Sequence, residues 1–92
     1  MNYTRVVSFQ APKAIIKSFR TCCRTILLSS KDKGLAYAVG YARAGLDLST
    51  SAGIHTQCLY ILGNITHWRK DPAATVRKEL KAIAAALAED KE

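Results

Sequence analysis

The sequence predicts a mostly α protein: a compact four-helix domain with a short extended or β-like N-terminal segment. Three observations predict this class. Apolar residues recur at helical spacing in four stretches, the connections between these stretches are only a few residues long, and no internal repeat or low-complexity tract interrupts them. Because 92 residues supply enough apolar side chains for one core but not for two, we expect a single domain over 1–92.

The N-terminal segment, 1–11, is the β-prone part of the chain. Val6, Val7 and Phe9 stand among polar residues, and Pro12 ends the segment. We interpret it as an extended arm because no second strand is evident in the sequence to pair with it. An edge strand remains the alternative interpretation.

The first helix is predicted from Lys13 onward, and Pro12 suits its first turn because that position needs no backbone N–H. Apolar residues at i, i+4, i+7 and i+11 form a stripe that we expect to face the core: Ile15, Phe19, Cys22 and Ile26.

A second helix is expected to begin near Ser29, because Ser29 and Asp32 have the spacing of a capping box. It should run to about Ala44, and Gly45 is placed to take a left-handed conformation just beyond its end. Small residues at four-residue intervals, Ala36, Gly40 and Ala44, predict the close approach of a neighbouring helix.

The third helix should start in the Ser/Thr-rich turn at 48–51 and continue to Trp68, with Arg69 and Lys70 in its last turn. Asp71 and Pro72 then form an N-cap and first-position pair for a fourth helix. Its apolar stripe consists of Val76, Leu80, Ile83 and Leu87. We expect 88–92 to fray, since acidic residues oppose the helix dipole there.

The net charge of +7 lies entirely in the first half of the chain. Up to Leu46, eight basic residues face the single acid Asp32, whereas six basic and six acidic residues cancel from Asp47 onward. Such an asymmetry is typical of proteins with a polyanionic or acidic partner.

Basic residues of the first helix carry the main candidate site. Lys13, Lys17, Arg20 and Arg24 repeat the spacing of the apolar stripe two positions later, which places them about 200° around the axis from it. The row has no interleaved acid, which favours a functional surface. The alternative is that the row is an ordinary solvated face. We expect reversing the charge of Lys17, Arg20 and Arg24 to abolish activity without affecting folding. Further candidate binding residues are Lys31, Lys33, Arg69, Lys70 and Arg77.

Aromatic residues admit two interpretations. Tyr37 and Tyr41, with Tyr60 and Trp68, are either base-stacking surfaces or simple packing, and we favour packing because aromatic pairs at i,i+4 usually pack. His55 and Cys58 have a spacing that permits a shared ligand, but His67 lies too far along the helix to complete a metal site.

Several classes of function are disfavoured. No paired carboxylates, glycine-rich phosphate loop or nucleophile motif appears, so we expect neither an enzyme nor a cofactor. The odd number of cysteines argues against a disulfide framework, and no signal peptide is evident, which favours the cytoplasm. The uncharged stretch from Leu48 to Trp68 contains too many polar residues for a membrane span.

The stretch Cys58-Leu-Tyr-Ile-Leu-Gly-Asn-Ile-Thr-His-Trp-Arg69, followed by Asp71-Pro72 and a basic helix, resembles small bacteriophage accessory proteins. The chain is similar in length, charge and helical content to phage anti-CRISPR inhibitors of the type I-F RNA-guided surveillance complex. This resemblance implies a monomeric, stoichiometric inhibitor in the cytoplasm of the host bacterium. It would bind a multi-subunit nucleoprotein complex, with its guide RNA as a further contact, and block binding of target DNA. The alternatives are a small basic nucleic-acid-binding module that contacts phosphates directly, an oligomeric sequestering protein and a helical adaptor.

Overall fold

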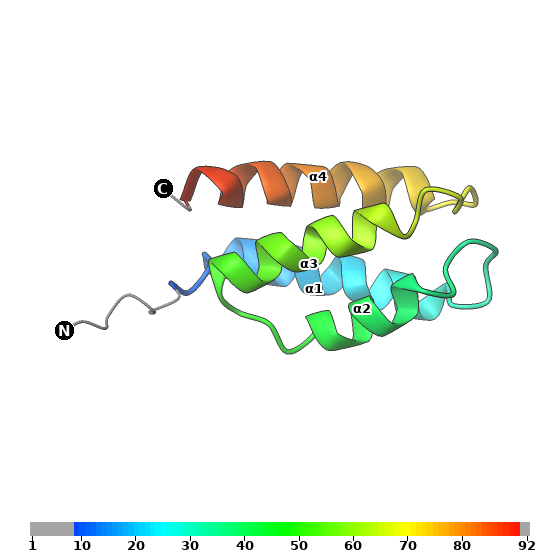
Figure 1. Ribbon diagram of the computed structural model, residues 1–92, viewed down its shortest axis with the longest axis horizontal. Coiled ribbons are helices and arrows are strands. Elements are labelled where there is room, and N and C mark those ends of the chain that lie inside the picture. The colour runs from blue at the N-terminus through cyan, green and yellow to red at the C-terminus, as the bar shows by residue number, and fades with distance from the viewer. Residues whose placement is uncertain (1–8, 91–92) are drawn as a thin grey trace.

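A computed structural model describes residues 9–90 of the chain, with side chains up to Ala88. It contains four helices: α1 (Lys13–Leu28), α2 (Ala38–Gly45), α3 (Ser51–Gly63) and α4 (Ala73–Asp90). Successive helices run antiparallel (Figure 1), and α1 and α3 each pack against both α2 and α4. The predicted mostly α, four-helix class is therefore confirmed.

Residues 9–11 are extended, but they do not form a free arm. Gln10 makes an isolated antiparallel β-bridge with Thr50. The Ala11 N–H donates to the Ser49 carbonyl and the Ser51 N–H donates to the Phe9 carbonyl, both at 2.8 Å. The start of the chain is therefore tied to the connection between α2 and α3, a partner that has no strand-like pattern in the sequence. The remainder of the predicted arm, 1–8, lies outside the described residues.

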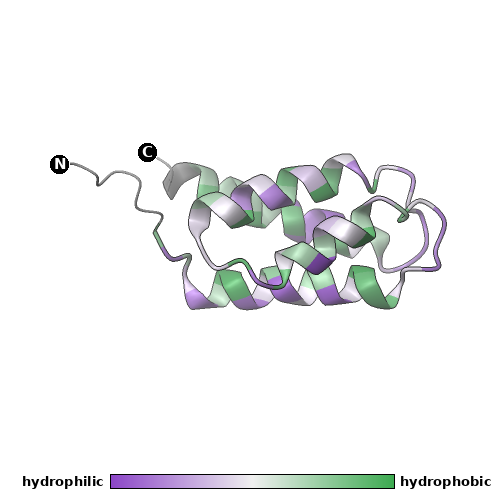
Figure 2. Ribbon diagram, turned by 60° about the horizontal axis from the view of Figure 1, so that its bottom comes forward, coloured by the Kyte–Doolittle hydropathy of each residue, from purple (hydrophilic) through white to green (hydrophobic). Residues whose placement is uncertain are grey.

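Helix α1 follows its predicted pattern. It begins at Lys13, and the Pro12 carbonyl accepts the first helical hydrogen bond, from the Ile16 N–H at 3.0 Å. Phe19, Cys22 and Ile26 of the predicted stripe are buried. Figure 2 shows hydrophilic residues recurring along the same helix between the apolar ones.

The predicted start of the second helix was wrong: α2 begins at Ala38, and 29–37 form turns. Gly34 has φ +94°, a conformation that favours glycine, and a Cβ atom there would lie 2.8 Å from the backbone of His67 and Trp68. Asp32 caps no helix, because its Oδ2 accepts a hydrogen bond from the Trp68 Nε1 at 3.0 Å. The predicted left-handed Gly45 is instead a buried residue at the end of α2.

Helix α3 is shorter than predicted. The Thr50 side chain caps its start by accepting from the Gly53 N–H at 3.1 Å, but the helix ends at Gly63 rather than at Trp68. Gly and Asn are poor helix formers, and Asn64 follows as the C-cap. Arg69 and Lys70 therefore lie in the turn before α4 and not in the last turn of a helix.

Helix α4 begins one residue later than predicted and extends further. The Pro72 carbonyl accepts from the Val76 N–H at 3.0 Å, so Pro72 precedes the first helical residue instead of occupying it. The helix continues to Asp90, so the part of the expected frayed tail at 88–90 is helical. Residues 91–92 lie outside the described part of the chain.

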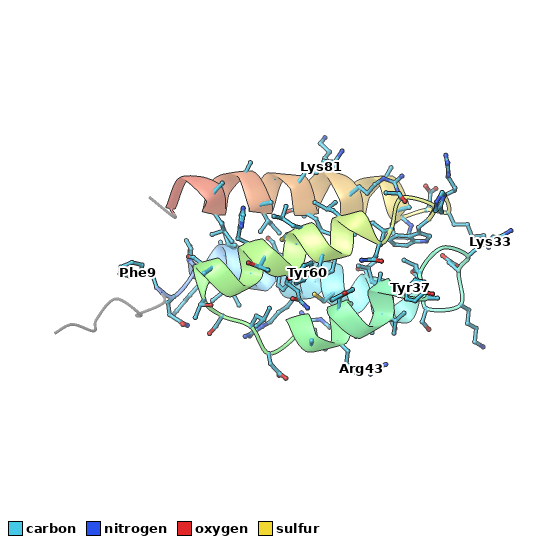
Figure 3. The ribbon with its side chains drawn as sticks, viewed as in Figure 1. Phe9, Lys33, Tyr37, Arg43, Tyr60 and Lys81 are labelled. Carbon is cyan, nitrogen blue, oxygen red and sulfur yellow. The ribbon has the colours of Figure 1, made fainter. Side chains whose placement is uncertain are left out.

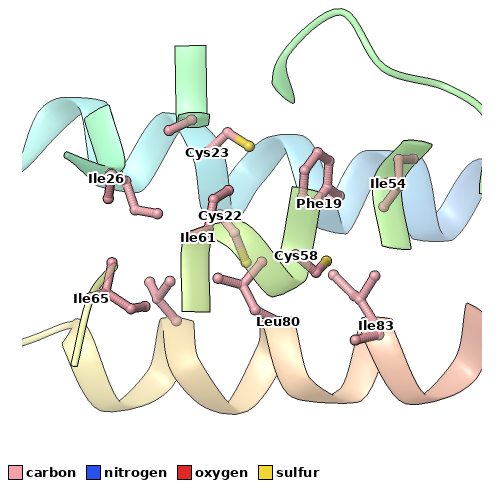
Figure 4. Packing of buried hydrophobic residues seen from close by; sticks show 14 of the residues in the cluster. Phe19, Cys22, Cys23, Ile26, Ile54, Cys58, Ile61, Ile65, Leu80 and Ile83 are labelled. Carbon is pink, nitrogen blue, oxygen red and sulfur yellow. The ribbon is translucent and has the colours of Figure 1, made fainter. Parts of the chain in front are cut away.

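The core runs the length of the bundle between the helices. Side chains from α1, α3 and α4 meet there (Figure 4), and each large apolar side chain that is fully buried contributes about 1.5–3 kcal/mol. The largest side chains with under 2% exposure are Trp68, Phe19, Ile26, Leu35, Ile54, Ile61, Ile65, Leu80, Leu87, Cys23 and Cys58.

We predict that Asp32→Ala lowers the free energy of unfolding by about 1–3 kcal/mol, because it leaves the buried Trp68 indole N–H without an acceptor. Urea unfolding followed by the fluorescence of Trp68, the single tryptophan, measures this change. The exposed Asp47 is a matched control, and Asp47→Ala should stay within about 0.5 kcal/mol of wild type. Equal stability of Asp32→Ala and wild type would contradict the assigned hydrogen bond.

Candidate functional site

The basic row of α1 lines one groove on the surface. Lys13, Lys17, Arg20 and Arg24 border a hollow of about 460 Å³. Its other lining residues are Gln10, Ile16 and Ser49. The groove exists because the paired segments 9–11 and 49–51 lie beside the first half of α1 and build a wall there.

The four cations of this row are not equivalent. Lys13, Lys17 and Arg24 are exposed, whereas Arg20 is half-buried. The Arg20 Nη2 donates to the Leu48 carbonyl at 3.2 Å, and its buried Nε has no hydrogen-bond partner in the described structure. Arg20 therefore holds the α2–α3 connection against α1, and its charge reversal should disturb folding. This contact argues against the expectation that charge reversal of a set including Arg20 leaves folding unaffected.

The groove keeps its positive charge. Among the side chains that the structure describes, no carboxylate oxygen lies within 4.0 Å of a cationic nitrogen of the row. Glu79 is the acid that borders the row: it lines an adjacent hollow of about 380 Å³ between α1 and α4, together with Lys17. Among the described side chains, Lys13, Lys17 and Arg24 therefore have no paired carboxylate, and all three are exposed.

A second cationic cluster forms at the end of the bundle where α1 ends. The turns 29–37 and 64–72 meet there and bring four exposed cations around one hollow of about 340 Å³. These cations, together called the end cluster, are Lys31, Lys33, Arg69 and Lys70. Asp32 and His67 also line this hollow, and the Asp32 carboxylate is bonded to Trp68.

Arg77 does not belong to either cationic surface. Its Nη1 donates to the Trp68 carbonyl at 2.7 Å and to the Ile65 carbonyl at 3.3 Å. Both carbonyls lie beyond the end of α3. The Ile65 carbonyl also accepts from the Trp68 N–H at 3.1 Å, so the guanidinium adds a donor to this non-helical turn. The Arg77 Nη1 is thus engaged with the protein's own backbone, and ligand binding by Arg77 stays a prediction.

The aromatic candidates separate into two environments. Trp68 is fully buried and offers no stacking surface. The three tyrosines are exposed: Tyr37 just before α2, Tyr41 on α2 and Tyr60 on α3. The rings of Tyr41 and Tyr60 pack with centroids 5.3 Å apart and a tilt of 33°. The packing interpretation therefore holds for this pair and for Trp68, while Tyr37 is left 80% exposed.

The cysteines are placed for packing and not for chemistry. All three are free and buried, and burial raises the pKa of Cys22 to about 11 and the pKa values of Cys23 and Cys58 to about 12. The nearby Glu79 adds to the shift of the Cys22 pKa. Neutral, buried thiols are poor nucleophiles and poor metal ligands. Among the described residues, no three side chains of the metal-binding types lie together.

No helix within residues 9–90 is both long and apolar enough to span a bilayer.

We predict that the folded protein resists alkylation by iodoacetamide at pH 8, whereas its thiols react readily in urea. The unfolded thiols lose protons near pH 9.0, and the folded ones retain theirs to pH 11–12, so stability should fall as the pH rises above 9. Mass spectrometry of timed alkylation, and unfolding measured at pH 8 and pH 10, test both statements. A thiol that reacts equally fast in folded and unfolded protein would contradict this environment.

Comparisons with known proteins identify no relative, because no protein-family model, no curated protein and no solved structure matches the chain. The resemblance to anti-CRISPR inhibitors therefore stays a prediction.

Proposed function

We propose that this protein is a non-enzymatic binding protein that holds a nucleic-acid phosphate backbone in the groove along α1. The observation that carries the proposal is the convergence of Lys13, Lys17, Arg20 and Arg24 on one groove with no carboxylate paired to them among the described side chains. A groove lined with one sign of charge concentrates counter-ions of the opposite sign.

The dimensions of the row suit a phosphate chain. From Lys13 to Arg24 the helix rises by about 16 Å, and successive phosphates of one strand are about 3.4 Å apart along a duplex axis. Gln10 and Ser49 add an amide and a hydroxyl to the groove, and their side chains already bond each other at 3.1 Å. Contacts of these types position a nucleic-acid backbone and do not discriminate between base sequences.

The sign of the charge distinguishes the two functions that the sequence suggested. A channel that is built to hold nucleic acid is itself positively charged, so it would repel the α1 groove. Exposed phosphates attract the same groove. Direct contact with nucleic acid, including the guide RNA of a ribonucleoprotein, is therefore better supported than occupation of an empty DNA channel.

Inhibition of a host RNA-guided surveillance complex is the second proposed function, and the end cluster favours it. A protein with two cationic surfaces is suited to bridge a ribonucleoprotein, with guide RNA on the α1 groove and an acidic protein surface on the end cluster. In this proposal the chain acts as a monomer in the cytoplasm of the host bacterium.

We predict that Lys17→Glu/Arg24→Glu weakens binding of a fluorescein-labelled single-stranded RNA and lowers its salt dependence. The slope of log K against log salt should fall by about 1.4, because each lost single-strand phosphate contact removes about 0.7. Fluorescence anisotropy between 50 and 200 mM salt measures this. Arg20 is left unchanged because it supports the fold.

The matched control for this experiment is Lys78→Glu/Lys81→Glu on α4, which changes the net charge equally at two exposed positions. It should retain the wild-type slope and most of the wild-type affinity. If both double variants lose affinity equally, only the overall charge matters and the α1 groove is not the site. If the wild-type protein binds neither RNA nor DNA at 50 mM salt, phosphate binding is refuted.

For the second function, we predict that equimolar wild-type protein prevents a purified type I-F surveillance complex from binding target DNA, and that Lys17→Glu/Arg24→Glu does not. A gel-shift assay with labelled target DNA measures the effect. If RNA binding is intact but the complex still binds its target, the inhibitor proposal fails and the phosphate proposal stands.

A further inference from the structure

Gly40 lies in the middle of α2, where neither the backbone conformation nor the packing requires a glycine. A glycine within a helix destabilises it relative to alanine. Its φ is not positive, and a Cβ atom built at this position meets nothing within 4 Å. The predicted close approach of a neighbouring helix does not occur, because Gly40 is exposed. The space above Gly40 is open to solvent.

Gly40 lines a hollow of about 480 Å³ between α2 and α3, which we call the tyrosine hollow. It is lined by Tyr37, Gly40, Tyr41, Ala44 and Asn64. Tyr41 forms a fixed wall, since its ring packs on Tyr60 and its carbonyl accepts from a neighbouring glutamine on α3 at 2.8 Å. Tyr37 also lines the hollow and is 80% exposed.

The chemistry of the lining is aromatic and polar but uncharged. None of the five lining residues is Lys, Arg, Asp, Glu or His, and α3 contains no Lys, Arg, Asp or Glu. The Asn64 Nδ2 donates to the Tyr60 carbonyl at 2.8 Å, and the amide has an Oδ1 acceptor and a second N–H besides this bond. Two tyrosine rings and an amide that line one hollow suit a flat, neutral heterocycle that carries hydrogen-bonding groups.

Cations stand at one end of this hollow. Tyr37 follows Lys33 of the end cluster by four residues, and in Figure 3 Tyr60, Tyr37 and Lys33 succeed one another from the middle of the bundle toward that end. If a neutral aromatic ring occupied the hollow, anionic groups joined to that ring would therefore lie beside the end cluster. Bases joined by phosphates have this pattern of charge.

We infer that the tyrosine hollow binds an unpaired nucleobase, so that the nucleic acid of the proposed function is single-stranded. This inference rests on that function and adds to it the strand type that is recognised. Stacked, paired bases of a duplex do not expose their faces, whereas single strands stack their bases on exposed aromatic side chains. A second copy of the chain is a less suitable occupant, because a stable dimer buries about 800 Å² on each partner and the lining offers only five residues.

Gly40→Leu and Tyr37→Ala test this inference with a mixed-sequence 12-nucleotide RNA, single-stranded or paired with its complement. Both variants should bind the single strand about 5- to 150-fold more weakly, the range for losing one base stack, while duplex binding stays unchanged. Tyr37→Phe should retain wild-type affinity because it keeps the ring. Gly40→Leu should be at least as stable as wild type, since leucine is the better helix former, so any loss of binding is not a loss of folding.

Ala82→Leu, at an exposed position of α4, is the matched control and should bind as wild type does. If Gly40→Leu and Tyr37→Ala bind the single strand normally, this inference is overturned while phosphate binding by α1 stands. If the wild-type protein binds neither RNA, the proposed function fails and the inference with it. If sedimentation shows a wild-type dimer that Gly40→Leu dissociates, the hollow is a contact between copies and the inference is overturned.

Discussion

The hydrogen bond between the buried Trp68 indole and the Asp32 carboxylate is the interaction on which the end of the bundle depends. It joins two turns that are 36 residues apart in the sequence. Gly34 allows this contact because its backbone lies directly against that of His67 and Trp68, where any Cβ atom would clash. The end cluster is a consequence of this junction, since both turns contribute cations to it.

The basic residues divide into those that hold the fold and those that face solvent. Arg20 and Arg77 donate to backbone carbonyls at places where the chain leaves helical geometry, a task that suits a guanidinium with five donors. Within the described part of the chain, Lys13, Lys17 and Arg24 make no such contact, and they are exposed. Charge counting in the sequence does not distinguish these two roles: Arg20 lines the groove and also supports the fold, whereas Lys13, Lys17 and Arg24 line the groove and are exposed.

The sequence predicted the number of helices and their apolar faces, because burial imposes a helical period that is visible in α1 and α4. It did not predict the turn over 29–37, since the Ser29–Asp32 pair matches a capping box locally while Asp32 bonds a tryptophan from a distant segment. The pairing of Gln10 with Thr50 is likewise non-local. The basic row on α1 could be predicted from the spacing of its residues in the sequence. The end cluster and the tyrosine hollow depend on tertiary contacts, which residue spacing does not reveal.

The central claim is that the exposed cations of α1 contact phosphates directly. Backbone amide NMR shifts recorded during titration with a short single-stranded RNA at low salt test it most directly. The account predicts that the largest shifts map to residues 10–24 and 49, which border the groove, and that they diminish as salt is added. Shifts confined to the outer face of α4, or shifts insensitive to salt, would contradict it.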